Sequence, residues 1–81
     1  MTIDDAIAEL SERIKVASRE AVIRITRVSA EEASIRAYAP AEAEKPIKEA
    51  TIERSIELLT SDGLDVQVFV YDIATSLPPE E

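Results

Sequence analysis

The sequence predicts an α+β domain that forms a two-layer sandwich, with a three-stranded mixed sheet and two helices on one of its faces. Two observations support this fold class. Apolar residues recur at helical spacing in two segments, and they alternate with polar residues in three others, which gives the order α-β-β-α-β. Helices with one apolar side each bury that side by packing together on one face of a sheet.

The first helix is expected at about residues 3–17, where apolar side chains recur every three or four positions. Thr2 and Asp5 have the spacing of a capping box, in which each side chain accepts a hydrogen bond from the other residue's backbone amide. Two acidic residues, Asp4 and Asp5, also suit the positive end of a helix dipole. The helix should therefore begin next to Thr2.

Three segments have the alternation of strands, at about residues 20–28, 32–38 and 64–73. The first two are joined by a short polar link, which predicts an antiparallel hairpin. The third is reached through a helix, so it should run parallel to the second strand in a right-handed crossover. We expect the first strand in the middle of the sheet, because both of its neighbours would then be antiparallel to it.

The second helix is expected between Pro46 and Gly63. Proline is well tolerated in a first helical turn, and glycine suits the left-handed residue that ends a helix. Residues 40–45, which precede it, are either a loop or one weak helical turn. The apolar stripe expected to face the sheet consists of Ile52, Ile56 and Leu59, supported by Ile47 and Leu58.

The strand alternation separates two faces of the sheet. The small aliphatic face should lie under the helices, and it comprises Ile23, Ile25, Ala33, Ile35, Ala37, Leu64, Val66, Val68 and Val70. The opposite face, named the open face here, comprises Val22, Arg24, Thr26, Val28, Ser34, Arg36, Tyr38, Gln67, Phe69 and Tyr71. The register of the third strand could instead be inverted, or the C-terminal tail could cover the open face.

The open face is the candidate binding site, with Tyr38, Phe69, Tyr71, Arg24 and Arg36 as its binding residues. These include all three aromatic residues of the chain, and tyrosine and arginine are enriched at interface hot spots. An exposed apolar patch on a small domain marks an interaction site. The simplest partner is a second copy whose sheet stacks on this face as a homo-oligomer. Alternatively, the third strand could pair with its symmetry mate if it lies at the sheet edge.

Aromatic and arginine side chains on a sheet also suit single-stranded RNA. The order α-β-β-α-β resembles that of type II KH domains, which implies RNA binding. That family's Gly-x-x-Gly clamp is missing, since Gly63 is the single glycine of the chain, and no binding residue carries over. The net charge of −8 disfavours both nucleic acid and anionic membranes as partners.

A catalytic function is not expected, and neither is a metal or a cofactor. The chain has no histidine and no cysteine, which removes the common nucleophile pairs and zinc ligands. A further alternative is an acidic inhibitor or decoy that binds a basic surface through Glu49, Glu53 and Glu57, which share one side of the second helix.

Length and composition predict a single domain at residues 1–75 and a flexible acidic tail at residues 76–81. No apolar run is long enough to span a membrane, and Asp4 and Asp5 stand where a secretory signal would carry positive charge. We therefore expect a cytoplasmic protein.

Overall fold

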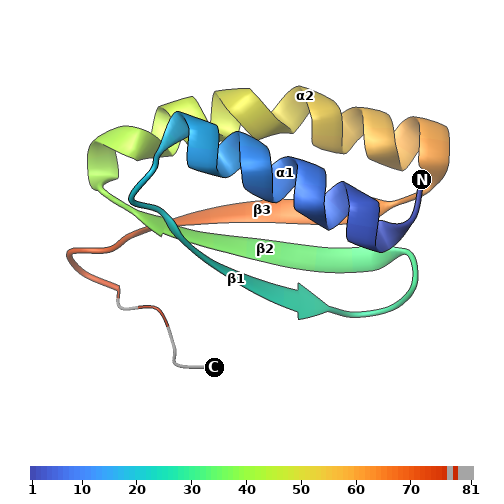
Figure 1. Cartoon of the computed structure of the whole chain (residues 1–81), viewed down its shortest axis with the longest axis horizontal. Coiled ribbons are helices and arrows are strands. Elements are labelled where there is room, and N and C mark those ends of the chain that lie inside the picture. The colour runs from blue at the N-terminus through green and yellow to red at the C-terminus, as the bar shows by residue number, and fades with distance from the viewer. Residues whose placement is uncertain (77, 79–81) are drawn as a thin grey trace.

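The computed structural model describes residues 1–76 and 78. It contains α1 (Ile3–Ala17), β1 (Val22–Arg27), β2 (Glu32–Ala39), the 3-10 turn η1 (Ala41–Ala43), α2 (Glu44–Asp62) and β3 (Asp65–Asp72). Both helices lie on the same side of a three-stranded mixed sheet, which confirms the predicted α+β fold and its element order (Figure 1). The tail expected at residues 76–81 lies, apart from positions 76 and 78, outside the described residues.

The ends of the helices follow the local signals in the sequence. Asp5 N–H donates to the Thr2 hydroxyl at 3.2 Å, and Thr2 N–H donates to the Asp5 carboxylate at 3.3 Å, so the predicted capping box is present. Pro46 lies in the first turn of α2, and Gly63 ends that helix with a left-handed φ of 68°. The stretch before Pro46 is helical rather than a loop, because η1 leads directly into α2.

The order of the strands is β1-β2-β3, so the prediction of a central first strand was wrong. β2 pairs antiparallel with β1, as the hairpin predicted, and parallel with β3. Three alanines, Ala33, Ala37 and Ala39, point from β2 towards the helices and are buried. The central strand has the least room beneath two helices, and small side chains suit it.

The core lies between the helices and the aliphatic face of the sheet. Ile35 and Val66 are buried, and Val68 and Val70 pack against the core. The alternation on β3 therefore has the predicted register rather than the inverted one. Ile25 is an exception, because it lies on the aliphatic face near the end of the edge strand β1 and keeps 45% of its surface exposed.

The predicted apolar stripe of α2 was wrong for Ile52, Ile56 and Leu59, and it is confirmed for its supporting residues Ile47 and Leu58. Ile52, Ile56 and Leu59 are 58%, 56% and 50% exposed, whereas the residues of α2 that reach the core are Ile47, Thr51 and Leu58. Thr51 can be buried because its hydroxyl donates to the Ile47 carbonyl at 2.9 Å. A reading that treats threonine as polar misses this second stripe.

Candidate functional site

The open face is the side of the sheet that carries no helix (Figure 1). The strand register places all five predicted binding residues on it. They come from all three strands, and the strand register determines which of them are neighbours. Arg24 of β1 is the register partner of Arg36 in β2, and Arg36 is the register partner of Phe69 in β3. Two residues further along β2, Tyr38 is the register partner of Tyr71.

Tyr38 and Tyr71 form a stacked pair. Their ring centroids are 5.2 Å apart, and the ring planes are inclined by 21°. Tyr38 was expected to be uncovered, but it is only 6% exposed because it lies on the central strand between Val22 and Tyr71. The contact surface offered by this stack therefore comes from Tyr71, which is 38% exposed.

Phe69 lies beside the stack on β3 and is 42% exposed. It borders Arg36, which is half-buried on the central strand. The Arg36 Nε atom is buried and has no hydrogen-bond partner among the described residues. A buried donor without an acceptor is costly.

Arg24 lies across the hairpin from Arg36, and one of its guanidinium nitrogens donates to the backbone carbonyl of Ile23 at 3.1 Å. Like charges directly opposite one another in a sheet are unfavourable. Together the two arginines make this part of the open face basic within a protein of net charge −8.

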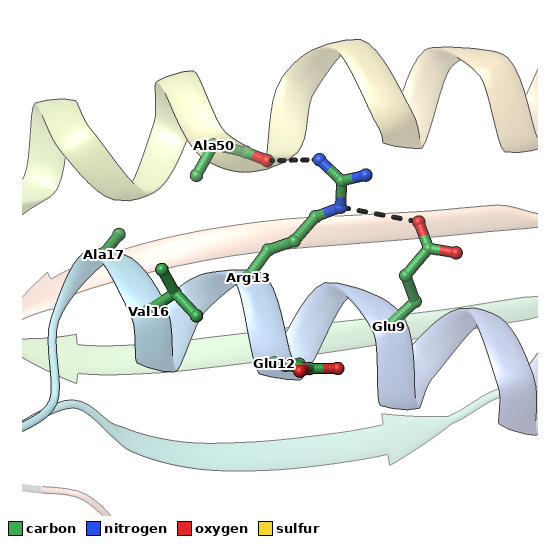
Figure 2. Close-up of a pocket in the computed structure, with 6 residues that line it drawn as sticks. All are labelled: Glu9, Glu12, Arg13, Val16, Ala17 and Ala50. Carbon is green, nitrogen blue, oxygen red and sulfur yellow. Dashed lines mark hydrogen bonds and ion pairs between the residues drawn. The ribbon is translucent and has the colours of Figure 1, made fainter.

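A surface depression lies elsewhere, between α1 and α2. It has a volume of about 490 Å³ and is lined by Glu9, Glu12, Arg13, Val16, Ala17 and Ala50 (Figure 2). Its polar groups bond to each other, since Arg13 contacts Glu9 at 3.4 Å and donates to the Ala50 carbonyl at 3.5 Å. The Arg13–Ala50 contact joins α1 to α2, whereas the Arg13–Glu9 contact lies within α1, and both are structural contacts.

Arg54 of α2 also bonds to Glu9 of α1. Its guanidinium donates to both carboxylate oxygens of Glu9, at 2.5 Å and 3.2 Å. The hydrogen bond from Arg54 lowers the pKa of Glu9, helped by the charges of Arg54 and Arg13 and opposed by burial. The same hydrogen bond raises the pKa of Arg54. This pair fixes how α1 packs against α2.

The acidic side of α2 is partly neutralised within the helix. Glu49 lies 3.9 Å from Lys45, and Glu57 lies 3.6 Å from Arg54. Within the described residues, no group of three or more carboxylates could hold a metal ion. None of the described helices is both long enough and apolar enough to cross a bilayer.

The sequence did not predict that an exposed apolar stripe on α2 would occur together with an uncovered edge strand. Ile52, Ile56 and Leu59, named the outer stripe here, are exposed on α2, and β3 is an edge strand beneath them. The sequence did contain a signal for the exposed stripe, because α2 has apolar residues on two sides of the helix instead of one. Deciding which side faces outwards required the packing of α2 on the sheet.

Comparison of the chain with protein-family models, with curated proteins and with solved structures finds no match.

Proposed function

We propose that this protein is a non-catalytic protein-interaction module that self-associates, with the open face as part of its contact surface. The observation that carries the proposal is the position of the aromatic residues. All three in the chain lie on the face that the helices leave uncovered, and Phe69 and Tyr71 each expose about two-fifths of their surface.

The chemistry of the open face suits a protein partner. Phe69 and Tyr71 offer flat apolar area, and Tyr71 is held in place by its stack on Tyr38. Arg36 is half-buried beside Phe69 and adds a positive charge at the border of this apolar area. Aromatic and arginine residues together are typical of the energetic centre of protein interfaces.

The non-catalytic part of the proposal rests on composition. A chain without histidine and cysteine lacks the groups most often used for nucleophilic and proton-transfer chemistry near neutral pH. We propose no cofactor, and we place the protein in the cytoplasm. RNA binding and action as an acidic decoy for a basic surface stay alternatives, and direct binding assays distinguish them from the main proposal.

The mass of the protein in solution, measured by light scattering, tests the proposal. The 8.9 kDa wild-type chain should have at least twice its monomer mass at about 100 µM, a concentration at which weak dimers form. Phe69→Ser combined with Tyr71→Ser should lower that mass while circular dichroism shows the same fold. Val16→Ser, on an exposed position of α1, is the matched control and should leave the mass unchanged.

A monomeric wild type under these conditions would contradict self-association. If the double variant unfolds, Phe69 and Tyr71 are needed for folding and do not form a free contact surface. Tight binding of short single-stranded RNA at physiological salt would favour the RNA-binding alternative instead.

A further inference from the structure

The two edges of the sheet are protected very differently. β1 forms one edge and carries Arg24 and Arg27, and charged residues on an edge strand discourage pairing with other chains. β3 forms the other edge. Its residues 66–71 include no charge, no proline and no glycine, so nothing in this stretch discourages the addition of another strand.

The hydrogen bonds of β3 show which backbone groups face outwards. Asp65 N–H donates to Glu31 at 2.8 Å, and Ile73 N–H donates to Ala39 at 3.0 Å, so the odd-numbered residues bond to the β2 side. Alternation along the strand then directs the amides and carbonyls of Val66, Val68 and Val70 towards the free edge. These are three donors and three acceptors in a row.

The outer stripe of α2 has one residue, Ile52, next to this free edge. A groove of about 330 Å³ between α2 and β3 is lined by Lys48, Thr51, Ile52, Ser55 and Val68, which places Ile52 next to the middle of the strand. The opposite flank of α2 is occupied by α1, through the contacts from Arg54 to Glu9 and from Arg13 to Ala50. The outer stripe therefore extends the apolar surface outwards at the β3 edge.

We infer that a second copy of this chain pairs antiparallel with β3, about a two-fold axis at Val68, and packs its α2 against the outer stripe. This inference rests on the self-association in the proposed function and specifies its geometry. Val68 would pair with Val68 of the second copy, and Val66 with Val70. All three outward donors and acceptors of each copy would then be bonded, in a continuous six-stranded sheet.

The positions of charged residues and of Phe69 favour this arrangement. Lys48 lines the groove near the start of α2, whereas Asp62 ends α2 and Asp65 begins β3. The two-fold axis brings Lys48 of each copy, which lies 3.7 Å from Glu44 of its own helix, to the Asp62 and Asp65 end of the other, where its charge is opposite to theirs. On the open face, the Phe69 rings of the two copies become diagonal neighbours, a separation that aromatic side chains can bridge.

Stacking two open faces is less favourable for the same sequence. If the stack is centred on the aromatic residues, Arg36 meets Arg36 of the second copy. The carboxylates on this face, Glu32 and Asp65, lie at its far end, and Glu32 is four residues from Arg36 along β2. If the stack is shifted so that Arg36 of one copy meets Glu32 of the other, Tyr38 no longer lies over a strand of the second copy. Pairing through the β3 edge does not place Arg36 against Arg36 of the second copy.

Substituting charged residues into the outer stripe tests whether it contacts the second copy. Ile52→Glu combined with Ile56→Glu should convert the dimer to a monomer in light scattering, since carboxylates on an apolar contact must lose their hydration. Both positions are more than half exposed, so the monomer fold should persist. Val16→Glu is the matched control, because Val16 is 80% exposed on α1, and it should leave the mass unchanged.

The register is tested by cross-linking, which the absence of cysteine makes unambiguous. Val68→Cys should form a disulfide-linked dimer on mild oxidation, because Cα atoms of such a strand pair lie about 5.5 Å apart. Val70→Cys is the matched control. Its two copies would be offset by four residues, about 14 Å, which is beyond the reach of a disulfide.

Each outcome has a distinct meaning. A dimer that dissociates with the α2 variant and cross-links through position 68 supports the inference. A wild-type dimer that resists the α2 variant but dissociates with Phe69→Ser and Tyr71→Ser would overturn the edge arrangement and leave the proposed self-association standing. Equal cross-linking at positions 68 and 70 would overturn the register, and a monomeric wild type would overturn the self-association itself.

Discussion

Tyr38 shows how its strand position decides what an aromatic side chain can do. It shares the open face with Phe69 and Tyr71, yet it is buried because neighbouring strands flank it on both sides. Phe69 and Tyr71 stay exposed on the edge strand. Tyr38 therefore acts as the support on which Tyr71 stacks, and the proposed contact surface consists of the two residues of β3.

At the same scale, the Glu9–Arg54 pair makes a pH-dependent contribution to stability. The pKa of Glu9 is lowered in the folded protein, so the pair stabilises the fold above the unfolded pKa of that carboxyl group and loses its effect as the pH falls through the folded value. Glu9→Gln should lower the urea midpoint at pH 7, and the difference from wild type should shrink below about pH 4.

Glu12→Gln is the control for this prediction, because Glu12 is an exposed acid on the same helix. Its urea midpoint should stay close to the wild-type value at both pH values. A deficit for Glu9→Gln that is as large at pH 3 as at pH 7 would show that the carboxylate charge is not what stabilises the contact.

At the scale of the element, α2 is a helix with two apolar sides. Ile47, Thr51 and Leu58 face the core, whereas the outer stripe faces away from it. A helix that needed to cover only its own sheet would have polar residues on the second side. The outer stripe is therefore surplus to the monomer fold, and the proposed contact with a second copy would give it a role.

Two adjacent leucines test this division. Leu58→Ala should destabilise the monomer by about 3 kcal/mol, because it leaves a cavity at a fully buried site. Leu59→Ala should cost less than about 1 kcal/mol, because half of that side chain is already exposed. Urea denaturation at low protein concentration, where the chain is monomeric, measures both. Similar losses at the two positions would contradict the assigned faces of α2.

At the scale of the whole molecule, an 81-residue chain has a thin core. A domain of this size buries only about 60–65% of the surface of its unfolded chain, and this one has no disulfide to compensate. Its central strand contributes mostly alanines to the core. Burying the outer stripe and the β3 edge between two copies would add the apolar area that a single chain lacks.

The melting temperature should therefore depend on protein concentration. A dimer that dissociates on unfolding is stabilised by mass action, so a hundredfold increase in concentration should raise the melting temperature by about 5–10 °C. Calorimetry measures this shift. Ile52→Glu with Ile56→Glu should abolish the dependence, whereas Val16→Glu should keep it. A wild-type melting temperature that is independent of concentration would count against the proposed dimer.

The sequence by itself determined the elements, their ends and the side of the sheet on which the aromatic residues lie. These features depend on neighbours along the chain, such as the Thr2–Asp5 cap, the left-handed Gly63 and the alternation along β3. Local periodicity and backbone preferences specify them directly. The five candidate binding residues were found in this way.

The tertiary structure decided which strand is central and which stripe of α2 is buried. Both depend on contacts between distant segments, and more than one arrangement satisfies the local pattern. Placing β2 in the centre buries Tyr38 and leaves β3 at an edge. The bonded hydroxyl of Thr51 lets α2 bury the side that looks more polar and turn Ile52, Ile56 and Leu59 outwards. Together these choices place an apolar helix surface above an unprotected strand.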